Sequence, residues 1–408
     1  MADLGTLLTY ERMKTLINRL ETVYNDAYKS AVKNEQAWIN KLSSLPKDAP
    51  LEKRTAFANE VVRRGKQKNR IAREIANAGT TAARIIQGEL SNIYGLNYEF
   101  SAYSISRQAE LNLSPDFAIY DRNQLAVLVR ENQSPFTRIA YRNMGNDTEI
   151  VKRLQNQLMQ ATILGESQQQ IVQRIRKVTG QSISQARRVA QTERVRIQSE
   201  GRFLGMQEAA AIGLGIKKQW ISRMDDRVRD DHALITGEIV DYDEPFSIGL
   251  MFPGDPDGEA AEVINCRCVM KSMVESTSPA LAVHREKFGR DIGFDEWRKN
   301  RLTNAGNSGI LQYRKFGTVK KLNRHIKDHL KEFPGFTKTD YVYRASELLR
   351  SQVSGDILGF TGINGKIFRY DINNNDFAVG NANGTIATLF KPTDFLEYWK
   401  EQVKKYGN

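Results

Sequence analysis

Apolar residues recur at every third or fourth position along most of the first two hundred residues. Between Leu7 and Tyr28 the apolar positions keep this spacing, which gathers them on one face of a helix. The pattern breaks at residues 45–50 and then resumes on a basic background as far as Ile86. Residues 1–93 are therefore predicted to form long amphipathic helices whose apolar faces pack together.

The pattern is more mixed over residues 94–147, after which the helical spacing returns. Ser167 and Gln170 have the form of a capping box at a helix start. We expect this helix to stop at Thr179-Gly180, because glycine disfavours a helix interior. The next helix is expected to end at Gly213, where glycine suits a helix C-terminus.

From Gly215 onward the sequence is rich in Gly, Pro and Asp, which is typical of a compact, loop-rich unit. A polar stretch follows, which we interpret as a linker. The last hundred residues contain two helical patterns, a closing helix, and four short strand patterns at 357–360, 366–370, 377–379 and 385–390. Short strands with tight turns between them predict an antiparallel meander.

The chain is thus predicted to be a multidomain protein. It has a mostly α-helical region over 1–150, a small α+β domain over 151–275, a linker over 276–312 and a C-terminal α+β domain over 313–408. Its 408 residues exceed the length of one ordinary domain.

The chain carries a formal net charge of +12. Such a surplus favours contact with a polyanion, and nucleic acid (RNA or genomic DNA) is the expected partner. The alternative is a well-solvated basic surface. No apolar run is long enough to cross a membrane, and the two cysteines lie too close together for an unstrained disulfide. We therefore expect a reducing cytoplasm, or a particle assembled there.

The two cysteines, Cys266 and Cys268, follow His232 by about thirty residues. Two thiols, one imidazole and nearby carboxylates form a plausible ligand set for a structural zinc ion. The alternative is a hydrogen-bonded knot in which Asp226 pairs with Arg229 and the thiols are simply buried. The residues alone leave both interpretations open.

The same stretch resembles the phage Mu F-type head-morphogenesis family. The resemblance rests on Trp-x-x-x-x-Asp-Asp-Arg-Val-Arg-x-x-His beginning at Trp220, on the following Asn-Cys-Arg-Cys, and on the helix around Ala190, and it covers about residues 150–272. It implies a minor capsid protein, present in few copies in the virion or host bacterial cytoplasm, with portal and head proteins as partners. The positions carried over, which we expect to define the fold, are Asp226, Arg229, His232, Asn265, Cys266 and Cys268.

His325 and His329 lie four residues apart, so a helix would place them on one face. Residues 309–408 hold 16 Lys and Arg against 10 Asp and Glu, a net charge of +6. Histidines beside cations suit RNA cleavage without metal, in which one group deprotonates the 2′-OH and another protonates the leaving oxygen. The alternative is a basic helix that only touches phosphate.

The order of these elements, with Thr-Leu-Phe-Lys-Pro after the last strand, resembles the barnase–EndoU–colicin–RelE-like nucleases attached to phage head proteins. The resemblance covers about residues 313–406. It implies that His325 and His329 are acid and base, and that Arg369, Thr388 and Lys391 face phosphate. Two alternatives remain, namely a structural, DNA-binding virion protein with an inactive tail domain, and a polymorphic toxin.

Overall fold

The computed structural model describes residues 3–114, 116–120, 122–277, 287–289, 292–304, 316–351, 353–362, 365–382 and 384–407. The chain forms two compact units. The first comprises Met1–Ser91, Gln133–Arg194 and Glu259–Cys266, and the second comprises Asn92–Asn132, Val195–Gly258 and Arg267–Asn408. Among the described residues, no helix combines the length and apolarity that crossing a lipid bilayer requires.

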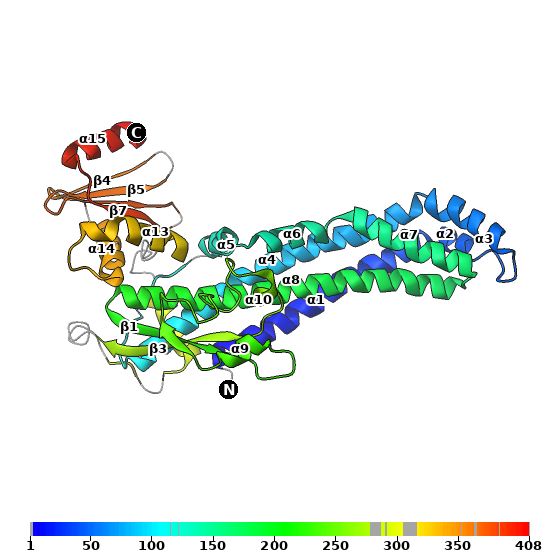
Figure 1. Ribbon diagram of the computed structural model, residues 1–408, viewed down its shortest axis with the longest axis horizontal. Helices are drawn as coiled ribbons and strands as arrows, with labels where there is room; N and C mark the ends of the chain where they lie inside the picture. Colours follow the sequence, from blue (N-terminus) through cyan, green and yellow to red (C-terminus); the bar gives the residue numbers. More distant parts are fainter. Residues whose placement is uncertain are drawn as a thin grey trace. The chain divides into compact units, whose positions relative to one another are not determined.

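The first unit is helical, as its apolar spacing predicts. Its elements are α1 (Leu4–Asn34), α2 (Gln36–Leu42), α3 (Leu51–Ala58), the π-helical turn η1 (Asn59–Arg63), the first part of α4 (Gln67–Gln108), α6 (Pro135–Met144), α7 (Asp147–Leu164), the first part of α8 (Gln168–Ala211) and α10 (Ala260–Val263) (Figure 1). The stripe of α1 is buried at Met13, Leu16, Leu20 and Tyr24. Burial of this stripe gives the helix its stability.

Two helices run further than the sequence predicts. Helix α4 continues to Gln108, well into the stretch expected to be mixed, and α8 passes through Gly180 without a break. Glycine inside a helix costs about 1 kcal/mol relative to alanine. Ile175 and Val178 are fully buried just before Gly180, and two such side chains contribute more than that cost. The expected stop at Gly180 was therefore wrong.

The predicted start of α8 is confirmed. The Ser167 backbone N–H donates to Oε1 of Gln170 at 2.9 Å, and the Gln170 N–H donates to Oγ of Ser167 at 3.4 Å. These reciprocal bonds satisfy amides that have no partner within the helix.

The second unit contains a small antiparallel sheet together with several helices. Its elements are the remainders of α4 and α8, α5 (Arg122–Glu131), β1 (Leu214–Ile221), α9 (Asp230–Leu234), β2 (Ile239–Asp241), β3 (Val269–Thr277) and α12 (Phe294–Asn304). The strand order is β2-β1-β3, and alternate residues of β1 are buried. That alternation is the mark of a strand with one face on the core.

The stretch predicted to be a linker, residues 276–312, holds regular structure at its start and in its second half. Strand β3 reaches Thr277, and α12 lies between residues 294 and 304. The rings of Phe294 and Trp297 lie 5.5 and 5.8 Å from that of Tyr103, so aromatic packing holds this helix. Residues 278–286 and 305–315, including the polar run expected to be flexible, lie outside the described residues.

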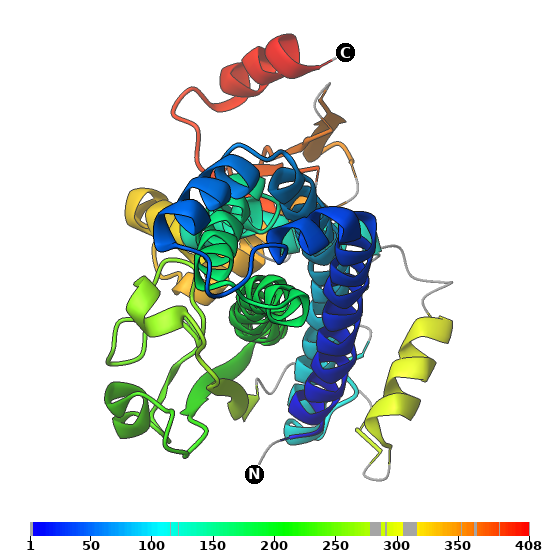
Figure 2. The same ribbon diagram turned by 90° about the vertical axis from the view of Figure 1, so that its right-hand side faces the viewer.

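The C-terminal part forms the predicted meander. Its elements are α13 (Val319–His329), the 3₁₀ turn η3 (Leu330–Glu332), α14 (Lys338–Arg350), β4 (Ile357–Thr361), β5 (Ile367–Asp371), β6 (Asp376–Gly380), β7 (Ile386–Phe390) and α15 (Phe395–Tyr406). The antiparallel strands follow the order β4-β5-β6-β7, which leaves β7 at an edge. Helices α13 and α14 cover one face, and α15 covers the other (Figures 1 and 2). The multidomain fold class, mostly helical at first with small antiparallel sheets after it, is confirmed.

Candidate functional site

The local fold brings the Cys-Arg-Cys stretch beside the end of β1. The last residue of β1, Ile221, pairs with Val269, the first residue of β3, so Cys268 lies immediately beyond the ladder. Asn265 precedes the stretch with a φ of 58°, a left-handed conformation that asparagine tolerates. Helix α9 supplies His232.

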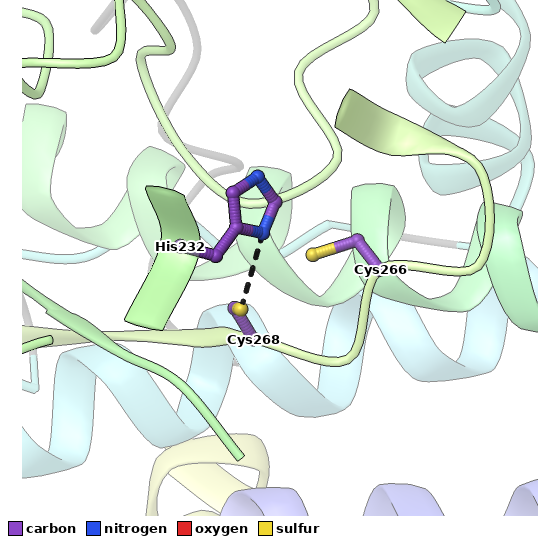
Figure 3. A group of neighbouring side chains, drawn as sticks. All are labelled: His232, Cys266 and Cys268. Carbon is purple, nitrogen blue, oxygen red and sulfur yellow. Dashed lines mark hydrogen bonds between the residues drawn. The ribbon is translucent and has the colours of Figure 1, made fainter. Parts of the chain in front are cut away.

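His232, Cys266 and Cys268 form a buried cluster (Figure 3). Their possible ligand atoms all lie within 4.8 Å of one another, and Nδ1 of His232 is 3.5 Å from Sγ of Cys268. The exposed fractions are 1%, 1% and 2% respectively. Both thiols are free. The structure thus brings together all three residues that the sequence analysis named as metal ligands.

Ser222 ties this cluster to β1. Its hydroxyl donates to the His232 carbonyl at 2.5 Å and accepts from Nε1 of Trp220 at 3.1 Å, while the Cys268 thiol lies 3.5 Å away. The Trp220 ring also meets the His232 ring edge-on at 5.1 Å. Burial is the largest single influence and lowers the pKa of His232, but the hydrogen bond to Cys268 and the negative charges of Cys268 and Asp231 together outweigh it, so the net shift is upward.

The loop before α9 is held by an ion pair that the sequence analysis did not name. Both guanidinium nitrogens of Arg267 lie 2.5 Å from the carboxylate oxygens of Asp225. This fork holds the pKa of Asp225 below its ordinary value. Asp226 and Arg229 belong to the same loop and short helix start, and Arg229 is the N-cap residue of α9.

The C-terminal histidines lie together on α13, next to edge strand β7. The His325 and His329 rings stack with centroids 5.8 Å apart. Oγ1 of Thr388 is 3.5 Å from Nδ1 of His325, and the Phe390 ring lies 5.4 Å from the His329 ring. Of the five residues predicted to be catalytic, three therefore lie close together, namely His325, His329 and Thr388.

Glu332 is a member of this site that the sequence analysis missed. Nδ1 of His329 donates to its Oε1 at 2.8 Å, and the backbone N–H of Lys391 donates to its Oε2 at 2.8 Å. One carboxylate thus joins the end of α13 to the end of β7 and leaves Nε2 of His329 as the outward nitrogen. Its position three residues after His329 was the only feature of the sequence that could have indicated this contact.

The side chains of Arg369 and Lys391 bind other partners. Arg369 is on β5, two strands from β7, and its guanidinium donates to the Ser351 and Phe368 carbonyls. Nζ of Lys391 lies 2.6 Å from the carboxylate of Asp376. The structure does not bring these two cations to the histidines, and their phosphate-facing role stays a prediction.

Lys321 is a cation on the same face of α13 as the two histidines. Lys321 precedes His325 by four residues, so Lys321, His325 and His329 lie along one face. Lys321 is exposed. Burial, followed by the positive charges of His329 and Arg324, lowers the pKa of His325. His325 is therefore neutral at pH 7 and able to accept a proton.

Comparison with known proteins gives the class of the central segment. Residues 152–271 match the family described as phage Mu protein F like protein, in agreement with the motifs around Trp220 and Cys268. This match and the relative described next support the class of phage minor head proteins.

The relative is minor head protein GP7 of Bacillus phage SPP1. It is 26% identical to this chain over 300 residues, which cover 71% of this chain and 95% of that protein. The chain is also 33% identical over 158 residues to NAD(+)–arginine ADP-ribosyltransferase EFV of Enterococcus faecalis, and 28% identical over 130 residues to an uncharacterised protein of Haemophilus influenzae. These matches cover 38% and 32% of this chain, but only 32% and 26% of those two longer relatives.

Proposed function

We propose that this chain is a minor head protein of a tailed phage or prophage, and that residues 313–408 form a metal-independent ribonuclease domain. Residues 1–150 serve assembly with portal and head proteins, and residues 151–275 form the head-morphogenesis domain. The observation that supports the head function is the similarity to GP7 over nearly all of that protein's length. Low copy number and a place in the virion follow from the proposal.

The observation that carries the ribonuclease proposal is the histidine pair at the β7 edge. His325, kept neutral, removes the proton of a ribose 2′-OH, and that oxygen attacks phosphorus. The bond from phosphorus to the 5′ oxygen breaks as Nε2 of His329 gives this oxygen a proton. The products are a 2′,3′-cyclic phosphate and a 5′-OH, and solvent restores the two proton positions.

The remaining residues position these groups and balance charge. Glu332 fixes the ring orientation and tautomer of His329 through the bond to Nδ1. Thr388 holds the His325 ring through Nδ1. Lys321, exposed on the same helix face, is the cation that we assign to the phosphate, because charge that develops on phosphate oxygens is stabilised by a nearby cation.

The head function is tested by mass spectrometry of purified particles. The chain should be found in filled heads at a small fraction of the major capsid protein, and deletion of residues 1–93 should abolish that association. Absence from both proheads and mature particles would rule out the head function.

The ribonuclease function is tested with end-labelled RNA and DNA. The full chain should cleave RNA equally in EDTA and in Mg²⁺, should leave 2′,3′-cyclic phosphate ends, and should spare DNA, which lacks the 2′-OH nucleophile. Cleavage of both polymers, or strict dependence on Mg²⁺, would contradict the mechanism.

A second function is favoured by the charge of the same domain. Residues 309–408 carry a net charge of +6, which suits a basic module that binds nucleic acid through phosphate without cleaving it. Tight, salt-dependent RNA or DNA binding with no cleavage would establish it. In the toxin alternative, the N-terminal two-thirds would be a trafficking module, and 158 residues of the chain are similar to part of a longer NAD(+)–arginine ADP-ribosyltransferase.

A further inference from the structure

We propose that His232, Cys266 and Cys268 bind a Zn²⁺ ion. Thiolates and imidazole are the ligands that zinc prefers. Bonds of about 2.3 Å to sulfur and about 2.0 Å to nitrogen at a tetrahedral angle place the two ligand atoms about 3.5 Å apart. Nδ1 of His232 and Sγ of Cys268 lie 3.5 Å apart, so this pair already has the separation of two zinc ligands.

The second thiol completes the set. Cys266 and Cys268 belong to one three-residue stretch, so chain connectivity holds both thiols at the same place, and Sγ of each lies within 4.8 Å of the imidazole nitrogen (Figure 3). Among the described residues, no set of four possible ligands clusters in this way, but Asp231 and Glu262 form a second group with His232 that does not include the thiols. A water molecule or one of these carboxylates would supply the fourth ligand of a tetrahedral ion.

Burial and the surrounding contacts suit a structural ion. All three side chains are at most 2% exposed, and Ser222 lies 3.5 Å from the Cys268 sulfur as a hydrogen-bond partner outside the ligand set. The ion would fasten α9 to the start of β3. The chain between α9 and β3 holds two short elements, β2 and α10, and metal binding often contributes to folding where regular structure is sparse.

The first test uses the full chain purified from zinc-supplemented medium. Elemental analysis should find about one zinc per chain, and removal by a chelator should lower the melting temperature, which added Zn²⁺ should restore. Co²⁺ added to the zinc-free chain should give intense thiolate-to-cobalt absorption and tetrahedral d–d bands. Unchanged melting after chelation, together with no cobalt spectrum, would overturn the proposal.

The second test separates metal loss from simple core damage. Cys268→Ser and His232→Asn should lower bound zinc from about one per chain to near zero. Val269→Thr is the matched control, since it places a polar isostere at the adjacent buried position without touching a ligand. It should lower stability but keep the zinc stoichiometry.

Ser222→Ala should retain zinc at saturation with an affinity reduced about 10- to 100-fold, as for other partners outside the ligand shell. Equal zinc content in Cys268→Ser, Val269→Thr and wild type would place the metal elsewhere.

Discussion

The Mu F-like segment and the C-terminal domain each gather histidine beside other reactive side chains, but they place them differently. His232 lies at 1% exposure among buried thiols, whereas the side chain of His329 is 28% exposed at the edge of a sheet. The first arrangement is sealed by Trp220 and Ser222. The second leaves Nε2 of His329 without a partner among the described residues.

This difference in exposure suits a structural role for the buried cluster at His232 and a substrate-binding role for His329. A polymer such as RNA can reach a helix face beside an edge strand, but it cannot reach a cluster covered on every side. We therefore expect changes at Cys268 to appear in stability and metal content, and changes at His329 to appear in catalysis.

The largest effect should come from His329→Ala. Loss of one acid or base typically costs about 10² to 10⁴ in rate, and the melting temperature should change little because the side chain is partly exposed. Cys268→Ser should show the opposite pattern, with a large loss of stability. RNA-cleavage kinetics and thermal unfolding of both variants measure this. A catalytic loss in Cys268→Ser that exceeds its stability loss would break the comparison.

Glu332→Gln should have an intermediate effect. A hydrogen bond to a charged group is worth about 1.5–3 kcal/mol, so loss of the carboxylate should slow cleavage about 10- to 100-fold. The loss should fall on kcat rather than KM, and the pH–rate profile should shift, because Glu332 acts through His329. Glu347→Gln, at an exposed position of α14, is the matched control. Identical pH profiles for wild type and Glu332→Gln would remove the positioning role.

A further effect is a pH dependence of stability that arises in the central segment. Lys218 is fully buried, and its Nζ donates to the Met251 carbonyl at 2.8 Å. Burial lowers its pKa from 10.5 to about 7. Between about pH 7 and pH 10.5 the unfolded chain binds a proton there that the folded chain does not, so the free energy of unfolding rises with pH across this window.

Lys218→Met should flatten that rise, whereas Lys53→Met, at an exposed position, should leave it unchanged. Denaturant unfolding at several pH values measures the slope. Equal slopes in wild type and Lys218→Met would mean that this lysine is charged in the folded chain.

The sequence predicts the elements that local patterning determines. The stripe of α1, the capping box at Ser167 and the four-strand meander follow from spacing and turn chemistry. Gly180 did not stop α8, and Phe294 and Trp297 form a helix in the predicted linker, because tertiary packing outweighs local preference at both places.

The site residues likewise divide into those that local sequence predicts and those that only tertiary packing reveals. The zinc ligands and the histidine pair are visible because their chemistry is unusual at short spacing. Glu332 and Lys321 are common surface residue types, and only the packing of α13 against β7 shows which of many acids and lysines face the histidines. The separation of Arg369 from that edge likewise depends on strand order, which spacing alone does not give.

The account depends most on whether the partly exposed pair His325 and His329 is catalytic. The most direct measurement is the rate of RNA cleavage in EDTA by the full wild-type chain and by His325→Ala. The account predicts cleavage by the wild type, with a rate that declines on the acid side only below the ordinary pKa of histidine, because burial lowers the pKa of His325 and the base is lost once it is protonated. It also predicts a rate about 10² to 10⁴ lower in the folded variant. No cleavage by the wild type under any ionic condition, or full activity in the variant, would contradict it.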